Sequence, residues 1–283
     1  MKIWLVMNIL SEYNKFTIFR VPYFFIILFS CFSLISFSQN YDSKSNSLGG
    51  VGLTETSVWS NFTNQAGLAE INQISIGAGT ENSFGIKELS THTAVFALPV
   101  NGGVFGLNVT YTGFELYNES KIGLAFAKKL SDGFNVGVQI DYLGVYADES
   151  TNNRNNFTFE IGAQKRLMRE LTLGAHIFNP IGVKLNEHEN IPSIFKLGLR
   201  YDANNKVAVF TEGELENEQN AKLKVGLEYK IIEQLQLRTG FSTNPTQNTF
   251  GIGYSIKNIQ LDIAVKRHQL LGYSPQFSVS SNF

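Results

Sequence analysis

The strongest constraint in this 283-residue sequence is an alternation of apolar with polar or small residues that runs through most of the chain. In 259–266 every second residue is Ile, Leu or Val, and the residues between them are Gln, Asp, Ala and Lys. The same pattern recurs in 136–142, 157–164, 195–201 and 222–230. Successive side chains of a β-strand point to opposite faces, so each segment predicts a strand with one apolar face. No segment after residue 70 shows a sustained helical stripe.

Counting these segments predicts about fourteen strands, most of them about 9–11 residues long, the length that a tilted strand needs to cross a bilayer. The predicted strands lie near 72–80, 90–98, 103–112, 119–129, 134–146, 157–166, 171–179, 192–201, 206–215, 220–230, 234–241, 248–256, 259–267 and 275–283. Short connections tend to alternate with longer ones, as in outer-membrane barrels. We therefore predict an all-β fold, a transmembrane antiparallel β-barrel of about 14 strands formed by residues 71–283.

A soluble β-sandwich or a lipocalin-like barrel would also alternate. Three features favour the membrane barrel: the large number of strands, aromatic residues near strand ends, and a last strand that closes on Phe283. The aromatic residues are Tyr111, Tyr142, Tyr201, Tyr229 and Tyr254.

The composition agrees with a membrane barrel. Only 17% of residues are charged, whereas about 25% is usual for a soluble domain. The formal net charge of −1 gives no global basic field for nucleic acid, and the single cysteine excludes a disulfide scaffold.

The N-terminus resembles an export signal. Residues Val21–Ser38 carry no charge, follow Lys15 and Arg20, and end in a small-x-small pattern at 36–38. We expect residues 1–38 to be a cleaved signal peptide and the mature chain to begin at Gln39, in the cell outer membrane. An uncleaved anchor and a lipoprotein-type processing site at 28–31 are the alternatives.

Residues 39–70 do not alternate, and their motifs resemble a known family. The motifs are LGGVG at 48–52, VWSN at 58–61 and NQAGLA at 64–69. In this order they are similar to the N-terminal signature of PorV/PorQ-like outer-membrane proteins of the FadL-type β-barrel superfamily. The resemblance extends to IFNP at 177–180 and to the C-terminal LGYSPQFSVSSNF, although Gln65 stands where the family usually has proline.

This resemblance implies that residues 39–70 fold back into the lumen as a plug or hatch. The residues of the plug motif are Gly49, Gly50, Gly52, Trp59, Asn61, Asn64, Ala66, Gly67 and Leu68. Small residues at inward strand positions, such as Gly106 and Gly251, would leave room for such a segment, but glycine also relieves strand strain where a barrel curves.

Alternation also predicts which charges face the lumen. These are Asp141, Glu160, Lys196, Arg200, Lys222, Lys224, Glu228, Arg238, Asp262 and Lys266. They would either pair with one another and with the plug or line a permeation path. Their mixed signs favour pairing, because a selective pore usually concentrates charges of one sign.

The sequence shows no pattern for catalysis, a metal or a cofactor. The four histidines have no close ligand spacing, and neither Gly-x-Gly motif joins a strand to a helix. Glu187-His188-Glu189 could hold a cation, but a solvated loop is the simpler interpretation. We therefore expect a protein that is not an enzyme and that binds no nucleic acid.

Two functions are compatible with these observations. The family resemblance implies a component or partner of type IX protein secretion, with secretion-system components or cargo bound at loops 147–156 and 181–191. The alternative is a FadL-like transporter with a hydrophobic ligand in the lumen. In both cases the outer wall would contact outer-membrane lipid.

Overall fold

The computed structural model describes residues 42–147, 154–184, 191–217 and 219–283, all of which belong to one compact unit, Phe37–Phe283. The expected signal peptide, Glu187-His188-Glu189 and most of loop 147–156 lie outside the described residues.

Within the described ranges, no helix is both long enough and apolar enough to span a membrane.

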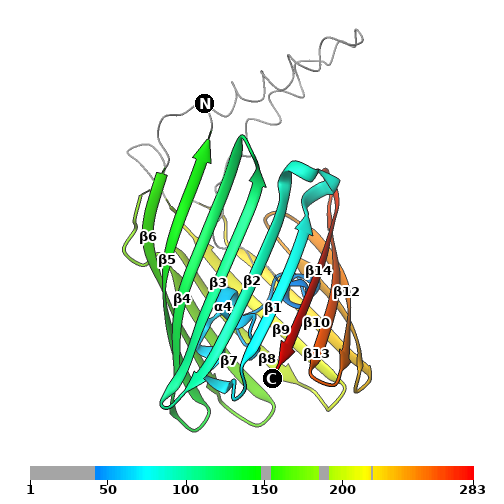
Figure 1. Cartoon of the computed structure of the whole chain (residues 1–283). Coiled ribbons are helices and arrows are strands. Elements are labelled where there is room, and N and C mark those ends of the chain that lie inside the picture. Colours follow the sequence, from blue (N-terminus) through cyan, green and yellow to red (C-terminus); the bar gives the residue numbers. More distant parts are fainter. Residues whose placement is uncertain (1–41, 148–153, 185–190, 218) are drawn as a thin grey trace, which may run out of the picture. The chain divides into compact units, whose positions relative to one another are not determined.

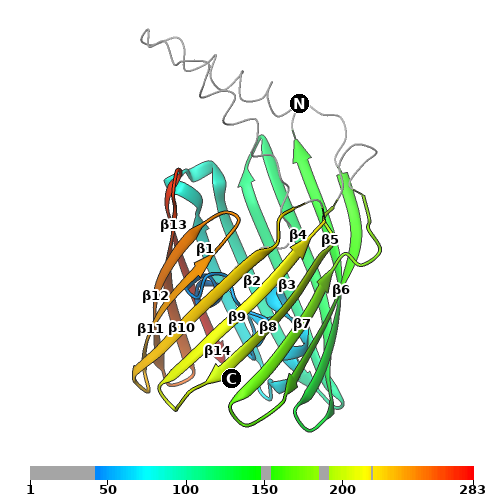
Figure 2. The ribbon, with the colours of Figure 1, turned by 180° about the vertical axis from the view of Figure 1, so that it is seen from behind.

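Fourteen antiparallel strands form a closed barrel, which confirms the predicted fold (Figures 1 and 2). Each strand is hydrogen-bonded to its neighbours in sequence, and the last strand pairs with the first. The strands are β1 (Ser75–Asn82), β2 (Ser90–Val100), β3 (Gly103–Phe114), β4 (Tyr117–Ser131), β5 (Phe134–Ala147), β6 (Arg154–Arg166), β7 (Leu171–Phe178), β8 (Ile194–Asp202), β9 (Val207–Glu216), β10 (Lys222–Ile232), β11 (Leu235–Ser242), β12 (Gln247–Ile256), β13 (Ile259–His268) and β14 (Gly272–Asn282).

The ring closes through the pairing of β1 with β14. The register runs from Ser75 opposite Asn282 to Glu81 opposite Gln276, and the Phe283 N–H donates to the Ile74 carbonyl at 2.8 Å. No strand is therefore left with an unpaired edge, which is the arrangement that a hydrocarbon environment requires of β-structure.

The two ends of the barrel differ in their connections. At the end where β1 begins and β14 ends, six connections of two to four residues join the strands, and we call this the turn end. At the opposite end, the loop end, connections range from two residues between β3 and β4 to fifteen between β7 and β8.

Side chains alternate between the two faces of the wall, as the sequence pattern predicts. Most leucine, isoleucine, valine and phenylalanine side chains of the strands point outward and are exposed, whereas the residues between them are mostly polar or small, point inward and are buried. Tyr111, Tyr201, Tyr229 and Tyr254 lie on the exposed outer face. The wall thus presents an apolar band to its surroundings and a polar face to the lumen.

The inside of the barrel contains the segment that precedes β1. It holds two short helices, α3 (Ser43–Ser47) and α4 (Ser60–Thr63), and a 3-10 helix, η1 (Gln65–Glu70). Both views show this blue segment inside the ring of strands (Figures 1 and 2). Two further 3-10 turns, η2 (Ser83–Gly85) and η3 (Lys87–Leu89), lie in the connection between β1 and β2.

The outward face gives a test of the apolar band. Leu227 lies in the middle of β10 and is 41% exposed on the outer surface. We expect Leu227→Arg to lower the free energy of unfolding by about 2–4 kcal/mol if residue 227 lies near the bilayer midplane. Urea unfolding of the protein in lipid vesicles measures this loss.

Gln260→Arg is the control, because Gln260 is half-buried on the inner face and already donates to Asp262 at 2.9 Å. Glu228 would be a poor control, since it accepts a hydrogen bond from Arg238 at 2.7 Å and a second guanidinium there would be repelled. Equal losses in the Leu227 and Gln260 variants would contradict a lipid-facing band.

Candidate functional site

The candidate site is the contact between segment 42–70 and the inner face of the wall. Its first helix begins because the Asp42 carboxylate accepts a hydrogen bond from the Ser45 N–H at 2.8 Å, as an N-cap does. The helix ends at Ser47, and Gly49 and Gly50 follow it with positive φ angles of 78° and 84°, which favour glycine. The local sequence therefore makes a one-turn helix followed by a sharp change of direction.

Glycines of the wall form the seat for this segment. Seven inward glycines lie so close to it that a Cβ atom on any of them would come within 2.7 Å of a segment atom. They are Gly106, Gly137, Gly162, Gly174, Gly226, Gly240 and Gly251. The missing side chains make room for the backbone of the segment at four of these positions and for the Asn61, Asn64 and Ser47 side chains at Gly106, Gly162 and Gly251. These contacts favour the room-making interpretation over strand curvature.

Two other small inward positions act differently. A Cβ on Gly253 would meet Arg238 and Asp262, and a Cβ on Gly123 would meet Asn108 and Gln139. These glycines therefore make room for polar side chains of the wall itself.

Two asparagines of the plug motif tie the segment to the backbone of the wall. Asn61 Nδ2 donates to the Val58 carbonyl at 2.9 Å and to the Phe96 carbonyl at 3.4 Å. Asn64 Nδ2 donates to three carbonyls, those of Leu53 at 2.9 Å, Ala163 at 3.0 Å and Ala175 at 3.3 Å. Each side-chain amide thus bonds at once to a carbonyl of the segment and to a carbonyl of the wall.

An apolar cluster fixes one side of the segment. Val58, Trp59, Phe62 and Leu68 are buried against a strip of the wall formed by small and β-branched residues. The strip consists of Val95, Ala97, Val104, Ala125 and Ala127, on β2, β3 and β4. A smaller cluster joins Leu48 and Val51 to Ala208 and Phe210 on β9.

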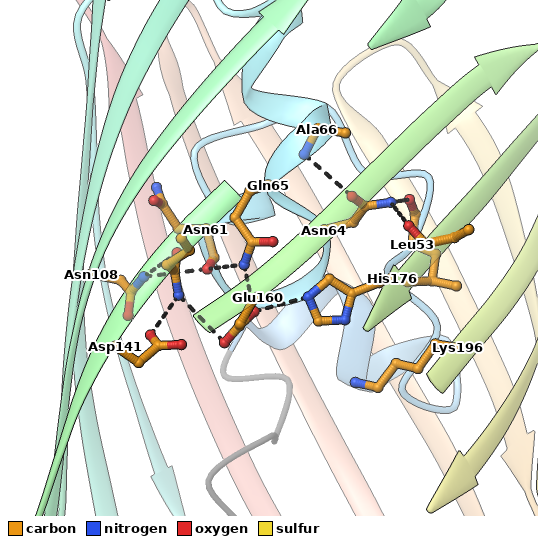
Figure 3. A network of polar contacts seen from close by, with 12 residues as sticks. Leu53, Asn61, Asn64, Gln65, Ala66, Asn108, Asp141, Glu160, His176 and Lys196 are labelled. Atoms are coloured by element: carbon orange, nitrogen blue, oxygen red, sulfur yellow. Dashed lines mark hydrogen bonds and ion pairs between the residues drawn. The ribbon is translucent and has the colours of Figure 1, made fainter. Parts of the chain in front are cut away.

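A buried polar network centres on Glu160 and receives the segment through Gln65 (Figure 3). Gln65 Nε2 donates to Glu160 Oε2 at 2.6 Å, and His176 Nε2 lies 2.9 Å from the same oxygen. Lys121 Nζ lies 2.5 Å from Glu160 Oε1. Gln65, which stands where the motif usually has proline, therefore makes a side-chain hydrogen bond that proline could not make.

Asp141 and Asn108 belong to the same network. Gln139 Nε2 donates to Asp141 Oδ1 at 2.8 Å, and Asn108 Nδ2 donates to Gln139 Oε1 at 3.0 Å and to the Asn61 carbonyl at 3.3 Å. Lys196 lies beside His176, its register partner across β7 and β8, and 3.9 Å from Glu214.

The other lumen-facing charges predicted from the sequence lie in ion pairs of mixed sign. Lys224 contacts Glu212 at 2.9 Å and Glu214 at 2.7 Å, and Lys222 contacts Glu214 at 3.0 Å. The remaining pairs are Arg238 with Glu228 at 2.7 Å and Asp262 at 2.5 Å, Lys266 with Glu81 at 2.6 Å, and Arg200 with Asp202 at 2.8 Å. This arrangement corresponds to the pairing interpretation.

The segment also has charges of its own. Lys44 Nζ lies 2.8 Å from Glu55 Oε2. Burial alone would raise the pKa of Glu55, but the Lys44 ammonium and hydrogen bonds from Lys44 and Ser57 lower it to about 2. Burial would likewise lower the pKa of Lys44, but Glu55 and Glu228 outweigh it and raise that pKa. The pair therefore stays ionised across the physiological range.

Asp42 has the opposite shift. Burial, assisted by the nearby Glu55 carboxylate, raises the pKa of Asp42 from 3.8 to about 6 despite the hydrogen bond from Ser45. The folded segment therefore binds a proton more tightly than an exposed aspartate does. This proton-linked stability is greatest at low pH and is lost as the pH rises from about 4 through about 6.

The structure brings together the whole plug motif on the seat, and it adds residues that sequence analysis missed. Five of these residues are glycines at inward strand positions, and the alternation of inward and outward side chains along each strand was the signal that could have found them. They are Gly137, Gly162, Gly174, Gly226 and Gly240. The same alternation places Lys121 and His176 on the lumen side of their strands. Nothing local in the sequence indicated Lys44 and Glu55 as a pair.

Among the described residues, no group of three or more His, Cys, Asp or Glu side chains is placed to hold a metal ion.

The comparison with solved structures shows the class of fold. No protein-family model and no curated protein matches the sequence. Solved structures, in contrast, match most of the chain.

The toluene transporter TbuX of Ralstonia pickettii superposes with a TM-score of 0.68 at 11% identity, covering 87% of this chain and 99% of that one. The toluene transporter TodX of Pseudomonas putida gives a TM-score of 0.68 at 12% identity, covering 87% of this chain and 98% of that one. A FadL homologue of Pseudomonas aeruginosa gives 0.62 at 13% identity, with coverage of 86% and 98%. At these identities the likeness establishes a shared fold.

The seat gives a test through Trp59, the only tryptophan after residue 38. A Cβ at Gly106 would overlap Asn61 and Leu68, so we expect Gly106→Val to displace the segment at a cost of about 1–3 kcal/mol. Acrylamide should then quench Trp59 fluorescence more strongly than in the original protein, where Trp59 is buried.

Gly213→Val is the matched control, because a Cβ there would meet only one atom, at 3.9 Å. Similar quenching of Trp59 in the Gly106 and Gly213 variants would contradict the seat.

Asp42 gives a test by pH. Ionising a carboxyl whose pKa has risen from 3.8 to about 6 costs roughly 3 kcal/mol. An asparagine in its place would keep the N-cap without that cost, so we expect Asp42→Asn to raise the urea concentration that exposes Trp59 at pH 8 and to change it little at pH 4. The difference between variant and original protein isolates Asp42 from other titrating groups, and a difference independent of pH would contradict the assignment.

Proposed function

We propose that this protein is a non-enzymatic outer-membrane channel for small hydrophobic molecules, closed by residues 42–70 as a plug. One observation carries the proposal. The apolar side of the segment, including Trp59 and Phe62, covers an apolar strip of the wall on β2–β4. When the segment moves away, this strip becomes the surface that a passing apolar molecule meets.

The placement in the outer membrane is supported by the outer face of the wall. Its exposed apolar band with tyrosines is what a lipid-facing barrel surface requires. Outer-membrane barrels have short periplasmic turns and longer external loops, so the turn end is the periplasmic end. The expected signal peptide at 1–38 would bring the chain there.

The nature of the contacts supports a plug that can move. Around the Glu160 network the segment is held by hydrogen bonds, which water in an open lumen can replace. Buried acceptors at the interface, Gln65 Oε1 and Asn61 Oδ1, have no hydrogen-bond partner among the described residues. Seating therefore carries a desolvation cost that offsets part of the gain from apolar contact.

The class of cargo is supported by the fold. TbuX and TodX, which share the barrel architecture, are described as toluene transporters. The alternative role in type IX secretion depends on the short motifs at 48–69, 177–180 and 271–283, whereas the transporter role is supported by a likeness over most of the chain. The transporter interpretation therefore replaces secretion as our first choice.

Uptake by cells tests the proposal. We expect cells that carry the protein in their outer membrane to take up radiolabelled toluene faster than cells with an empty vector, while arabinose uptake stays unchanged. A variant without residues 42–70 should let both solutes into the cell, because the charged side chains of the lumen wall then become accessible to water and polar solutes. Gly213→Val should behave like the original protein.

Assembly is verified in each strain by the heat-dependent gel migration of a folded barrel. Equal toluene uptake with and without an assembled barrel would contradict the channel. Unchanged arabinose uptake after deletion of 42–70 would contradict the plug.

A further inference from the structure

Charge on the outer face of the barrel is confined to very few positions. In the described parts of the fourteen strands, Asp, Glu, Lys or Arg occupies an outward position only at Lys128, Lys165 and Arg267. All three are basic. Lys128 and Lys165 lie at the turn end of β4 and β6, and Arg267 lies at the loop end of β13.

The two lysines flank one aromatic ring on the outer surface. Lys128 pairs with Val136 across β4 and β5, and Phe134, two residues before Val136, pairs with Lys165 across β5 and β6. Phe134 itself pairs with Ser131, beyond a β-bulge at 129–131, so it lies on the strand next to Lys128 and closer to the turn. Lys165 Nζ lies 5.7 Å from the centre of the Phe134 ring and 3.4 Å from the Asp132 carbonyl.

The adjacent turns add basic and apolar groups. The Arg166 N–H donates to the Gly133 carbonyl at 2.7 Å, which brings the β4–β5 turn and the β6–β7 turn side by side. Arg169, Leu167 and Met168 are exposed on the second turn. The acidic groups on these two turns are Asp132 and Glu170, and the basic groups on the turns and the adjoining strand ends, which include Lys128, Lys165, Arg166 and Arg169, outnumber them.

Other hairpins at this end lack the feature. Their outward positions nearest the turns are apolar or tyrosine, for example Val100, Tyr201 and Ile256. Lysines are therefore not a general means of ending the apolar band. Beyond the band lies the headgroup layer, which the long lysine stems can reach while their methylenes stay against apolar surface.

From this geometry, and resting on the membrane placement in the proposed function, we propose that Lys128 and Lys165 bind the headgroup phosphate of one anionic phospholipid in the periplasmic leaflet. Lys128 and Lys165 stand on the strands to either side of the one that carries Phe134, so both flexible side chains can reach one phosphate, and Val136 and Ala163 lie below on the same face to contact the acyl chains. The exposed turn residues Leu167 and Met168 close the site toward the periplasm.

Native mass spectrometry of the purified full barrel tests this site. The protein is incubated with equal amounts of phosphatidylglycerol and phosphatidylethanolamine, and the bound lipids are counted. Two lysines near an anionic surface predict a preference for phosphatidylglycerol of roughly tenfold or more. Lys128→Gln with Lys165→Gln should bring this ratio close to one, and Lys128→Arg with Lys165→Arg should retain it.

Lys206→Gln with Lys257→Gln is the matched control, because it removes two positive charges from turns at the same end without altering the outer face. This control should keep the preference. No preference in the original protein, or an equal loss in the control and in the variant that combines Lys128→Gln with Lys165→Gln, would overturn the proposal.

Toluene uptake, measured on the same variants, separates this site from the proposed function. Loss of the lipid preference with toluene uptake intact supports the site as a lipid site independent of transport. A preference that persists in a barrel that takes up no toluene contradicts the channel and leaves the lipid site supported. Failure of the original protein to assemble in lipid vesicles would overturn both.

Discussion

The hydrogen bonds between the first and the last strand are the constraint on which the rest of the structure depends. Without the pairing of β1 with β14, two strands would each expose a row of unsatisfied backbone groups. Once the ring is closed, the alternation along each strand determines whether a side chain faces the lumen or the outside. The apolar and the polar residues of the strands thereby separate onto two faces. The seat, the buried charges and the apolar band all follow from that separation.

Inside the ring, the seat depends on wall positions that have no side chain. Gly240 provides room for the segment backbone and Gly162 for the Asn64 side chain, which bonds to the Ala163 carbonyl of the wall. The charged half of the lumen stays buried at tolerable cost because the ions are paired, as in Lys224 with Glu212 and Glu214. The combination gives an interior that is filled yet largely polar.

The sequence determined the barrel because period-two patterning is a local signal repeated fourteen times. All strands appear where the alternation placed them, with differences of a few residues at their ends. The predicted inward charges follow from the same parity. The contacts of the segment could not be derived in this way, since Gln65 with Glu160 and Lys44 with Glu55 join positions that no periodicity relates. Such pairs depend on how an irregular chain turns inside the lumen.

The distribution of segment contacts around the wall has a consequence for biogenesis. Ser47 lies against Gly251 on β12, whereas Trp59 lies against Val95 on β2, so the seat is assembled from opposite extremes of the strand sequence. A few paired hairpins cannot hold the whole segment, because they offer only part of the wall that it contacts. A fully docked segment is thus a sign of a completed ring.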